Sequence, residues 1–407
     1  MRTTPPKISV VVPTCQRTAS LERLLQALAR QDLPQGQFEV IVVADGDPKA
    51  VEFLGQCSFP GQLRHVLQPL SGAGPARNLG ATLASAPVLL FLDDDVEPDS
   101  SLVRMHLEAA YRSDSVWLGN LITAIPQPPT YLAIGTRLWW EGKLRRMREP
   151  GHRFDYADLL SGHFSVPTSL FRKLGGFDPS FRCREDYEFG ARLMKLGVPF
   201  QLLASACALH HENPTLAKAL GRSRAEGAAD VRLARAHPEL MLSLGLARFH
   251  KGLGRKERLA LGNPRISEAA ARRLQSILPR LEKLGLRRYW NTYFVRLKRF
   301  WYMRGMQSEC ADWSELGRIP ARTEPVPEPS LTLDLAKGIP WAEAELDRHA
   351  PESVRLFFSD HPVAVIPAQA AAEPVRGRHL KPFLRDGAGY ELLVGVAWKT
   401  LAKADQA

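Results

Sequence analysis

Three consecutive aspartates, Asp93, Asp94 and Asp95, directly follow the apolar run Val88–Leu92, which is typical of a buried strand. Carboxylates packed this closely repel one another, and the repulsion grows as the site loses water. They therefore persist either fully solvated or beside a cation. Carboxylate oxygens suit Mg²⁺ and Mn²⁺, which often join protein carboxylates to substrate phosphates. The run favours a divalent metal site over a solvated strand end.

Polar residues also follow two earlier predicted strands. The run Ile8–Val12 leads into PTCQR, and the run Glu39–Val43 leads, after Ala44, into Asp45-Gly46-Asp47. An Asp-Gly pair after a strand is most often only a turn. In a parallel sheet, however, the carboxyl ends of the strands meet at one edge, where ligands bind. The sequence therefore directs attention to that edge.

The glycine-rich segment Gly72–Gly80 begins a predicted helix. Its glycines allow close backbone approach, and the amino end of a helix favours phosphate. Arg77 in this segment can fork onto a phosphate or a base, or it can simply be a salt-bridged arginine. The segment does not follow the first strand, so it is not the dinucleotide-binding fingerprint, which argues against a dehydrogenase.

Two further polar pairs lie later in the chain. Glu185-Asp186 precedes a predicted helix, where a carboxylate can act as a general base or can stabilise the helix dipole. His210-His211 can contribute a metal ligand, or can serve only packing and the surface. Neither pair alone decides between these alternatives.

The first part of the chain alternates short apolar strands with amphipathic helices. Further strands are predicted at Leu63–Leu67 and Val88–Leu92, with helices after Ser20, which we expect to be an N-cap, and over Gly74–Ala84. Such alternation predicts an α/β fold with a mostly parallel sheet and helices on both faces.

Taken in order, seven segments of the sequence resemble the family 2 glycosyltransferases of the GT-A fold. The resemblance covers roughly residues 7 to 212. It implies a metal-dependent inverting glycosyltransferase that moves a sugar from a nucleotide-diphospho-sugar to an acceptor hydroxyl, in glycan, glycolipid or glycosylated metabolite synthesis. The segments are VVVPTCQR, VIVVADGD, GPARNLGA, FLDDDVEPD, SGHFSVP, LGGFD and REDYEFGARL.

The resemblance also implies roles for individual residues. Asp186 corresponds to the general base, with Glu185 beside it for acceptor binding or orientation. A divalent cation, Mn²⁺ or Mg²⁺, corresponds to Asp95 with Asp93, and His210 to a third protein ligand. The nucleotide sugar is expected against Pro13, Thr14, Arg17, Asp45, Arg77, Asp93 and Asp94, with Asp45 at the base. Two positions depart from the family pattern, Ala44 in place of an aspartate and His163 in place of an asparagine.

The net charge of +11 is concentrated in one segment. Residues Asn213–Met306 carry 21 Lys+Arg against 6 Asp+Glu, a surplus of 15. An anionic membrane surface, nucleic acid or an acidic polymer would each explain this segment as a partner. Aromatic residues that pack on the catalytic domain, with solvated arginines, would explain it without a partner. Nucleic acid is the least favoured partner. The aromatic residues among these charges are Trp290, Tyr293, Phe294, Phe300, Trp301 and Tyr302.

The remaining features set the organisation of the chain. We expect a catalytic domain over 1–215, a basic helical extension over 216–317, a Pro-rich linker over 318–330 and a small C-terminal module of unknown role over 331–407, including two short strands around a turn at Asp360–Pro362. Five cysteines without a CxxC pair, no apolar run of membrane-spanning length and no typical secretion signal favour a cytoplasmic protein, with the inner face of the membrane as an alternative location.

Two rival functions differ in what they need from the sequence. A nucleotidyltransferase has a similar sheet but requires a glycine-rich loop with Arg and Lys directly after the first strand. The segment PTCQRTASLE, which follows the first strand here, contains no such loop. A non-catalytic nucleotide-sugar or membrane-surface binding protein would have no need of Asp93, Asp95 and Asp186.

Overall fold

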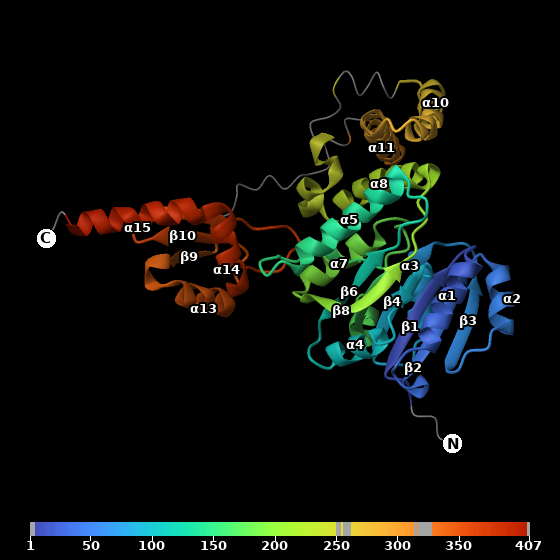
Figure 1. Ribbon diagram of the computed structural model, residues 1–407. Coiled ribbons are helices and arrows are strands. Elements are labelled where there is room, and N and C mark those ends of the chain that lie inside the picture. The colour runs from blue at the N-terminus through green and yellow to red at the C-terminus, as the bar shows by residue number, and fades with distance from the viewer. Residues whose placement is uncertain (1–4, 250–253, 255–261, 313–314, 316–327, 405–407) are drawn as a thin grey trace.

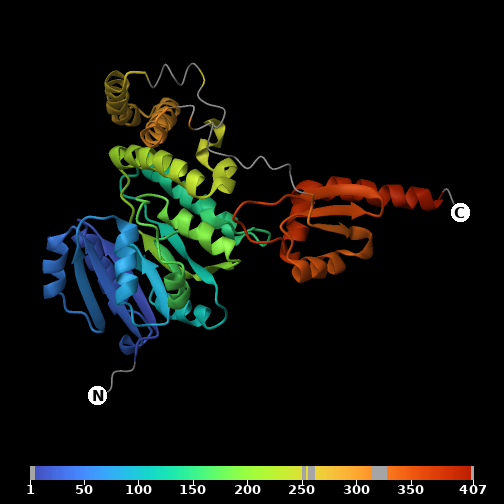
Figure 2. The ribbon, with the colours of Figure 1, turned by 180° about the vertical axis from the view of Figure 1, so that it is seen from behind.

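The computed structural model describes residues 5–249, 254, 262–312, 315 and 328–404. An α/β part is followed by a layer of helices that lies over one end of it, and a small module stands to one side (Figures 1 and 2). Among the described helices, none is long and apolar enough to cross a membrane.

The α/β part is built on one eight-stranded sheet with the order β3-β2-β1-β4-β7-β6-β8-β5. The half formed by β3, β2, β1 and β4 is parallel, as predicted, but β7 runs antiparallel to both β4 and β6, and β5 runs antiparallel to β8. The strands are β1 (Ile8–Thr14), β2 (Phe38–Asp45), β3 (Gln62–Gln68), β4 (Val88–Leu92), β5 (Val96–Pro98), β6 (Val116–Thr123), β7 (His163–Pro167) and β8 (Phe200–His210).

Helices cover both faces of this sheet, which confirms the predicted fold class. Side chains of β1 alternate between two cores, because Val10 and Val12 face the leucines of α1 while Val11 packs on the other face with Ala81 of α3. The helices are α1 (Thr18–Ala29), α2 (Pro48–Gln56), α3 (Ala73–Leu83), α4 (Leu102–Ala110), α5 (Tyr131–Arg148), α6 (Thr168–Lys173) and α7 (Glu185–Lys195).

The predicted start of the first helix is wrong. Ser20 lies inside the first turn of α1, and Arg17 occupies the N-cap position without a side-chain cap bond. Gln16 just before it has a positive φ of 56°, so the chain turns sharply at this point and the helix begins earlier than the serine suggested.

The helical extension consists of α8 (Leu216–Ala236), α10 (Pro264–Lys283) and α11 (Arg287–Glu309), with 3₁₀ turns at Pro238–Ser243 and Gly245–Phe249. Part of its aromatic stripe is used in packing: Trp290 and Trp301 are only 4% and 8% exposed and join one cluster with Leu278 of α10 and Leu132 of α5. The extension therefore packs directly on the α/β part.

Two glycines allow α8 and α11 to approach closely. A Cβ at Gly305 would overlap the carbonyl oxygen of Arg224, and a Cβ at Gly227 would overlap the carbonyl oxygen of Tyr302. The backbones of the two helices thus meet where side chains would otherwise separate them.

We expect Gly305→Ala to lower the free energy of unfolding by about 1–3 kcal/mol, since the added methyl group must push the two helices apart. Gly221→Ala is the matched control, because Gly221 lies on α8 with nothing within 4 Å of an added Cβ. Urea unfolding of both variants measures the effect. Equal stability of the two variants would contradict the close approach.

The C-terminal module has its own core and confirms the two strands predicted around residues 360–362. The sequence did not reveal the third strand or the three helices, and most of the predicted linker lies outside the described residues. The elements are β9 (Leu331–Asp334), α13 (Ile339–His349), β10 (Val354–Phe358), β11 (His361–Ile366), α14 (Gly377–Phe383) and α15 (Gly389–Ala404).

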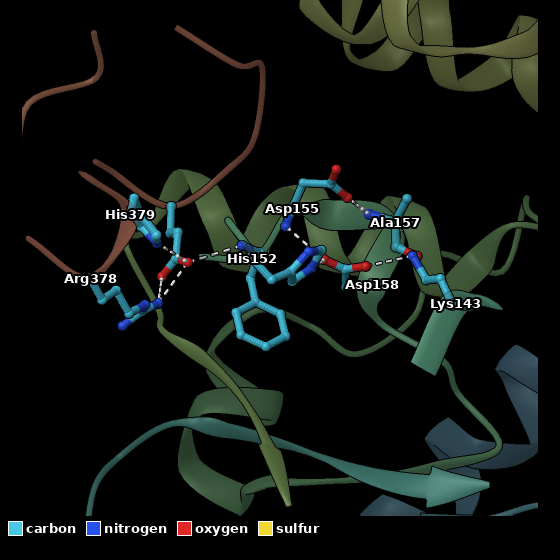
Figure 3. A network of polar contacts seen from close by, with 9 residues as sticks. Lys143, His152, Asp155, Ala157, Asp158, Arg378 and His379 are labelled. Carbon is cyan, nitrogen blue, oxygen red and sulfur yellow. Dashed lines mark hydrogen bonds and ion pairs between the residues drawn. The ribbon is translucent and has the colours of Figure 1, made fainter. Parts of the chain in front are cut away.

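The module contacts the α/β part through the segment after α5. The amide of Phe154 donates to Glu373 Oε1 at 2.9 Å, and Arg153 Nε donates to the Glu373 carbonyl at 2.6 Å. Figure 3 shows the two sides of this contact, with Lys143, His152 and Asp158 in one polar group and Arg378 and His379 on the module. The module is therefore held to the α/β part by hydrogen bonds as well as by the chain.

Candidate active site

A cleft of about 1530 Å³ opens where the carboxyl ends of β1 and β4 meet α5, α7 and the helical extension. Five of the predicted site residues line it, from four separate segments of the chain. They are Arg17, Asp93, Asp95, Asp186 and His210. The other predicted residues, Pro13, Thr14, Asp45, Arg77, Asp94 and Glu185, stand behind this lining, and several of them hold it in place.

The aspartate run divides into two outer residues that reach the cleft and a middle residue that does not. Asp94 is buried, and its carboxylate accepts hydrogen bonds from Thr14 Oγ1 at 2.8 Å and Arg17 Nη1 at 3.0 Å. Burial raises the pKa of Asp94 to about 6, against the opposing charge of Arg17. Asp94 therefore ties the end of β4 to the end of β1, beside Pro13.

Asp95 and His210 lie next to each other at one side of the cleft. The distance from His210 Nε2 to Asp95 Oδ1 is 3.3 Å, and β5 pairs with the end of β8 so that His210 lies opposite Val96. Burial alone would raise the pKa of Asp95, but the contact with His210 and the charge of Arg17 outweigh it and lower the pKa. Burial alone would lower the pKa of His210, and Asp95 reverses that shift.

A divalent cation fits this corner chemically. Asp95 Oδ1 and His210 Nδ1 are buried without a hydrogen-bond partner, and Asp93 adds a carboxylate that is one third exposed. Across the described part of the chain, no three His, Cys, Asp or Glu side chains are gathered closely enough to hold a metal by themselves. Mg²⁺ and Mn²⁺ sites commonly draw further ligands from substrate phosphates and water.

Asp45 organises the loop that follows β3. Its Oδ1 accepts from Gln68 Nε2 at 2.8 Å and from the Ser71 amide at 2.7 Å, and its Oδ2 accepts from the Gly72 amide at 2.8 Å. Gly46 has a φ of 65°, and a Cβ there would lie 2.7 Å from Leu70 Cβ. The turn after β2 therefore needs glycine, and a contact of Asp45 with a nucleotide base stays a prediction.

Arg77 is almost fully buried and bridges two carboxylates. Its Nη2 donates to Asp93 Oδ1 at 2.6 Å, and its Nη1 donates to Glu185 Oε1 at 2.9 Å. The Arg77 guanidinium, for which the sequence suggested a phosphate or a base as partner, is thus already bonded to two carboxylates of the protein. Arg77 links the aspartate run to the start of α7.

Asp186 lies in the first turn of α7 and points into the cleft. Among the described residues, its Oδ1 accepts a hydrogen bond from the adjacent Tyr187 amide, at 2.9 Å. The N-cap position belongs to Arg184, which has a left-handed φ of 62°. Burial, and then the charge of Glu185, raise the pKa of Asp186 to about 6. A carboxylate in this state can accept a proton near neutral pH.

With this geometry in place, residues 9–175 match the model of a family described as Glycosyl transferase family 2. These residues form a domain of the family 2 glycosyltransferase type. The match confirms the resemblance over these residues; Glu185, Asp186 and His210, the helical extension and the C-terminal module lie beyond it.

Proteins similar to this chain include a glucosyltransferase and a synthase. The validoxylamine A glucosyltransferase of Streptomyces hygroscopicus subsp. jinggangensis (strain 5008) is 33% identical over 227 residues, which cover 48% of this chain and 53% of that protein. The hyaluronan synthase of Pasteurella multocida is 25% identical over 242 residues, 51% of this chain and 25% of that protein. This chain thus spans about half the length of the glucosyltransferase.

Similar solved structures include a mannosyltransferase and TarS. One is the mannosyltransferase PcManGT from Pyrobaculum calidifontis in complex with GDP-Man and Mn²⁺, with a TM-score of 0.47 and 16% sequence identity. The match covers 75% of this chain and 88% of the PcManGT chain. Residues 1–349 of S. aureus TarS, in complex with UDP, have a TM-score of 0.40 at 18% identity and cover 75% of this chain and 93% of their own.

The sequence missed the contact between the family 2 domain and the extension. Arg184 Nε forms an ion pair with Asp230 Oδ1 of α8 at 2.9 Å, and Tyr302 Oη of α11 donates to Asp230 Oδ2 at 2.6 Å. Asp230 is fully buried, and the Arg184 guanidinium also lies 4.4 Å from the centre of the Tyr187 ring. The extension therefore holds the residue that precedes Glu185 and Asp186. The sequence held one signal for this contact: two acidic residues, Glu226 and Asp230, lie four positions apart on an otherwise arginine-rich helix.

His163, which departs from the family pattern, turns away from the cleft. Its Nε2 lies 3.0 Å from His106 Nε2, and both rings are buried. Burial lowers the pKa of His106 to about 3 and lowers that of His163 well below its usual value, so the pair is neutral. Gly162 beside it is the residue that lines the cleft.

Proposed function

We propose that this chain transfers a sugar from a nucleotide-diphospho-sugar to an acceptor hydroxyl with inversion of the anomeric centre. The observation that carries the proposal is a carboxylate, Asp186, with a pKa of about 6, in the same cleft as Asp93, Asp95 and His210. The family 2 match supports this reading over a nucleotidyltransferase or a non-catalytic binding protein.

Each residue takes a defined part in the proposed reaction. The donor would lie along the ends of β1, β2 and β4, with Asp45 at the base and Pro13, Thr14 and Arg17 near the nucleotide. Asp95, Asp93 and His210 would hold a divalent cation. Bound there, Mn²⁺ or Mg²⁺ would neutralise charge on the leaving diphosphate. Arg77 fixes Asp93 and Glu185 relative to each other.

Asp186 then removes the proton from the acceptor hydroxyl as its oxygen attacks the anomeric carbon. The bond from that carbon to the diphosphate oxygen breaks in the same displacement, so the configuration inverts. Glu185 keeps Asp186 basic through its negative charge, which raises the pKa of Asp186. The same proposal assigns residues 1–215 to catalysis and 216–317 to the extension that supports it.

The donor site is tested by nucleotide binding. We expect Mn²⁺ to strengthen the binding of UDP or GDP to the wild-type protein. In the presence of Mn²⁺, Asp95→Ala should weaken nucleotide binding at least about tenfold, because even a residue that only orients a metal ligand contributes about that much to metal affinity. Isothermal titration with and without Mn²⁺ measures both effects.

Asp99→Ala is the matched control, because Asp99 is an exposed aspartate four residues further along the chain. It should bind the nucleotide as the wild type does. If Mn²⁺ changes nothing in any of the three proteins, Asp95 is not a metal ligand. The glucosyltransferase relatives make a nucleotide-glucose the first complete donor to test.

A further inference from the structure

The helical extension supplies a basic wall to the active-site cleft. Five lysine and arginine side chains line it: Lys218 and Arg222 on α8, and Arg287, Arg288 and Lys298 on α11. None of them belongs to the residues matched by the family model, which end at residue 175. We call this set the basic wall.

Most of the basic wall has no carboxylate partner. Arg222 lies 3.4 Å from Glu226 and still has 64% of its side chain exposed. Within the described part of the chain, Lys218, Arg287, Arg288 and Lys298 form no ion pair, and Lys298 only approaches the Phe294 ring, at 5.9 Å. Unpaired cations of one sign along a concave surface attract anions and raise their local concentration.

The basic wall lies on the acceptor side of the proposed reaction. The cations near the donor end are Arg17, at the N-cap of α1, and Arg77 of α3, and both are already bound to aspartates. Arg222, by contrast, acts electrostatically on Asp186, the proposed base. The basic wall therefore adds cations that the aspartate run does not already engage, in the same cleft as Asp186.

Aromatic and apolar side chains from α5 lie in the same cleft. Trp139 and Leu138 line it with 49% and 58% of their surfaces exposed. An exposed indole face offers a platform for the apolar face of a sugar ring. The cleft thus presents both a stacking surface and positive charge beyond Asp186.

We propose that the acceptor is a soluble carbohydrate or polyol that carries phosphate or carboxylate groups, seated between α5 and the basic wall with one hydroxyl at Asp186. This inference rests on the proposed function. Arginine forks such as those of Arg287 and Arg288 match both phosphate and carboxylate geometry. A neutral glycan would leave these cations without a partner.

The test uses the full chain with UDP or GDP and Mn²⁺ present, so that the donor site is filled. The probes are fluorescently labelled short-chain polyphosphate and a polygalacturonate oligosaccharide, with a neutral maltooligosaccharide for comparison. We expect the anionic probes to bind more tightly than the neutral one. The double variant Arg287→Glu/Arg288→Glu should weaken the anionic probes about tenfold, since two exposed charges are reversed.

The matched control is Arg273→Glu/Arg280→Glu, which makes the same change of charge at exposed positions of α10 outside the cleft. It should leave probe binding within about twofold of wild type, because separated exposed charges are screened by salt. Lys218→Glu, on the other helix of the wall, should weaken the same probes. Circular dichroism confirms that each variant is folded.

Three results would overturn the inference: equal binding of neutral and anionic probes, equal loss in the α10 control, or binding that is restricted to vesicles containing phosphatidylglycerol, which would make the wall a membrane surface instead. Nucleoside diphosphate binding in the wild-type protein is scored separately. Its absence would refute the proposed function, whereas normal nucleotide binding with no effect of Arg287 and Arg288 refutes only the anionic acceptor.

Discussion

Replacing Asp186 by asparagine should slow sugar transfer about 10²–10⁴-fold, the usual contribution of a positioned general base. Asparagine keeps the shape of the side chain and can still accept the hydrogen bond from the Tyr187 amide. It cannot take a proton from the acceptor. Nucleotide affinity and thermal stability should therefore stay close to wild type, because neither depends on that proton transfer.

The measurement is the release of nucleoside diphosphate from a nucleotide sugar, with water or an added acceptor as the nucleophile. Asp178→Asn serves as the matched control, since this aspartate lies in the same domain but does not line the cleft. Transfer by Asp186→Asn at a rate close to that of the control would refute the assignment of the base. Asp186 also lies in the first turn of α7, so loss of its charge should cost at most about 1 kcal/mol of stability through the helix dipole.

The same assignment fixes the direction of the pH dependence. A base with a pKa of about 6 is charged above that pH and protonated below it. The rate in the wild-type protein should therefore fall as the pH drops through about 6. Glu185→Gln removes the negative neighbour that contributes to raising this pKa. In that variant the decrease in rate should therefore occur at a lower pH than in the wild type.

The residues that the sequence predicted best are those whose position depends on a strand end. A five-residue apolar run such as Val88–Leu92 is typical of a buried strand, and the carboxyl ends of parallel strands share one edge. This argument brings Asp93 and Asp95 to the cleft without any knowledge of side-chain contacts. It does not reveal β7, which lies antiparallel between β4 and β6. An apolar run of residues does not indicate in which direction its strand crosses the sheet.

The contacts that hold the site together were beyond reach of the sequence. Arg77 lies 108 residues from Glu185, and Asp47 accepts a hydrogen bond at 2.6 Å from the amide of Gln16, 31 residues away. Pairings of this kind follow from how the elements pack and not from local pattern. The same holds for Asp230, whose partners Arg184 and Tyr302 lie on two other helices.

The buried bridge formed by Arg77 should have the largest effect on stability of any single contact at the site. Arg77→Met would leave the carboxylates of Asp93 and Glu185 without their shared counterion. Breaking a buried ion pair in this way costs about 3–5 kcal/mol of unfolding free energy. We expect the lower part of that range, because the Asp93 side chain is 33% exposed and water can solvate part of its charge.

Arg104 provides a matched control on the surface. It also bridges two carboxylates, Asp32 at 2.9 Å and Glu108 at 3.1 Å, but its side chain is 37% exposed. Arg104→Met should therefore cost less than about 1 kcal/mol, as exposed ion pairs usually do. Urea unfolding of the two variants compares a buried bridge with an exposed one of the same chemistry.

A second substitution separates the loss of the bridge from the loss of packing. Adding Glu185→Gln to Arg77→Met removes one of the two unpaired charges, so it should restore part of the lost stability. The positive charge of Arg77 also lowers the pKa of Asp186, so the single variant should need a higher pH than wild type for full transfer activity. If Arg77→Met proves no less stable than Arg104→Met, or if Glu185→Gln destabilises it further, then the bridge does not hold the aspartate run against α7. Recovery of stability together with a shifted pH profile would mean that one buried arginine both supports the metal-side aspartate and tunes the base.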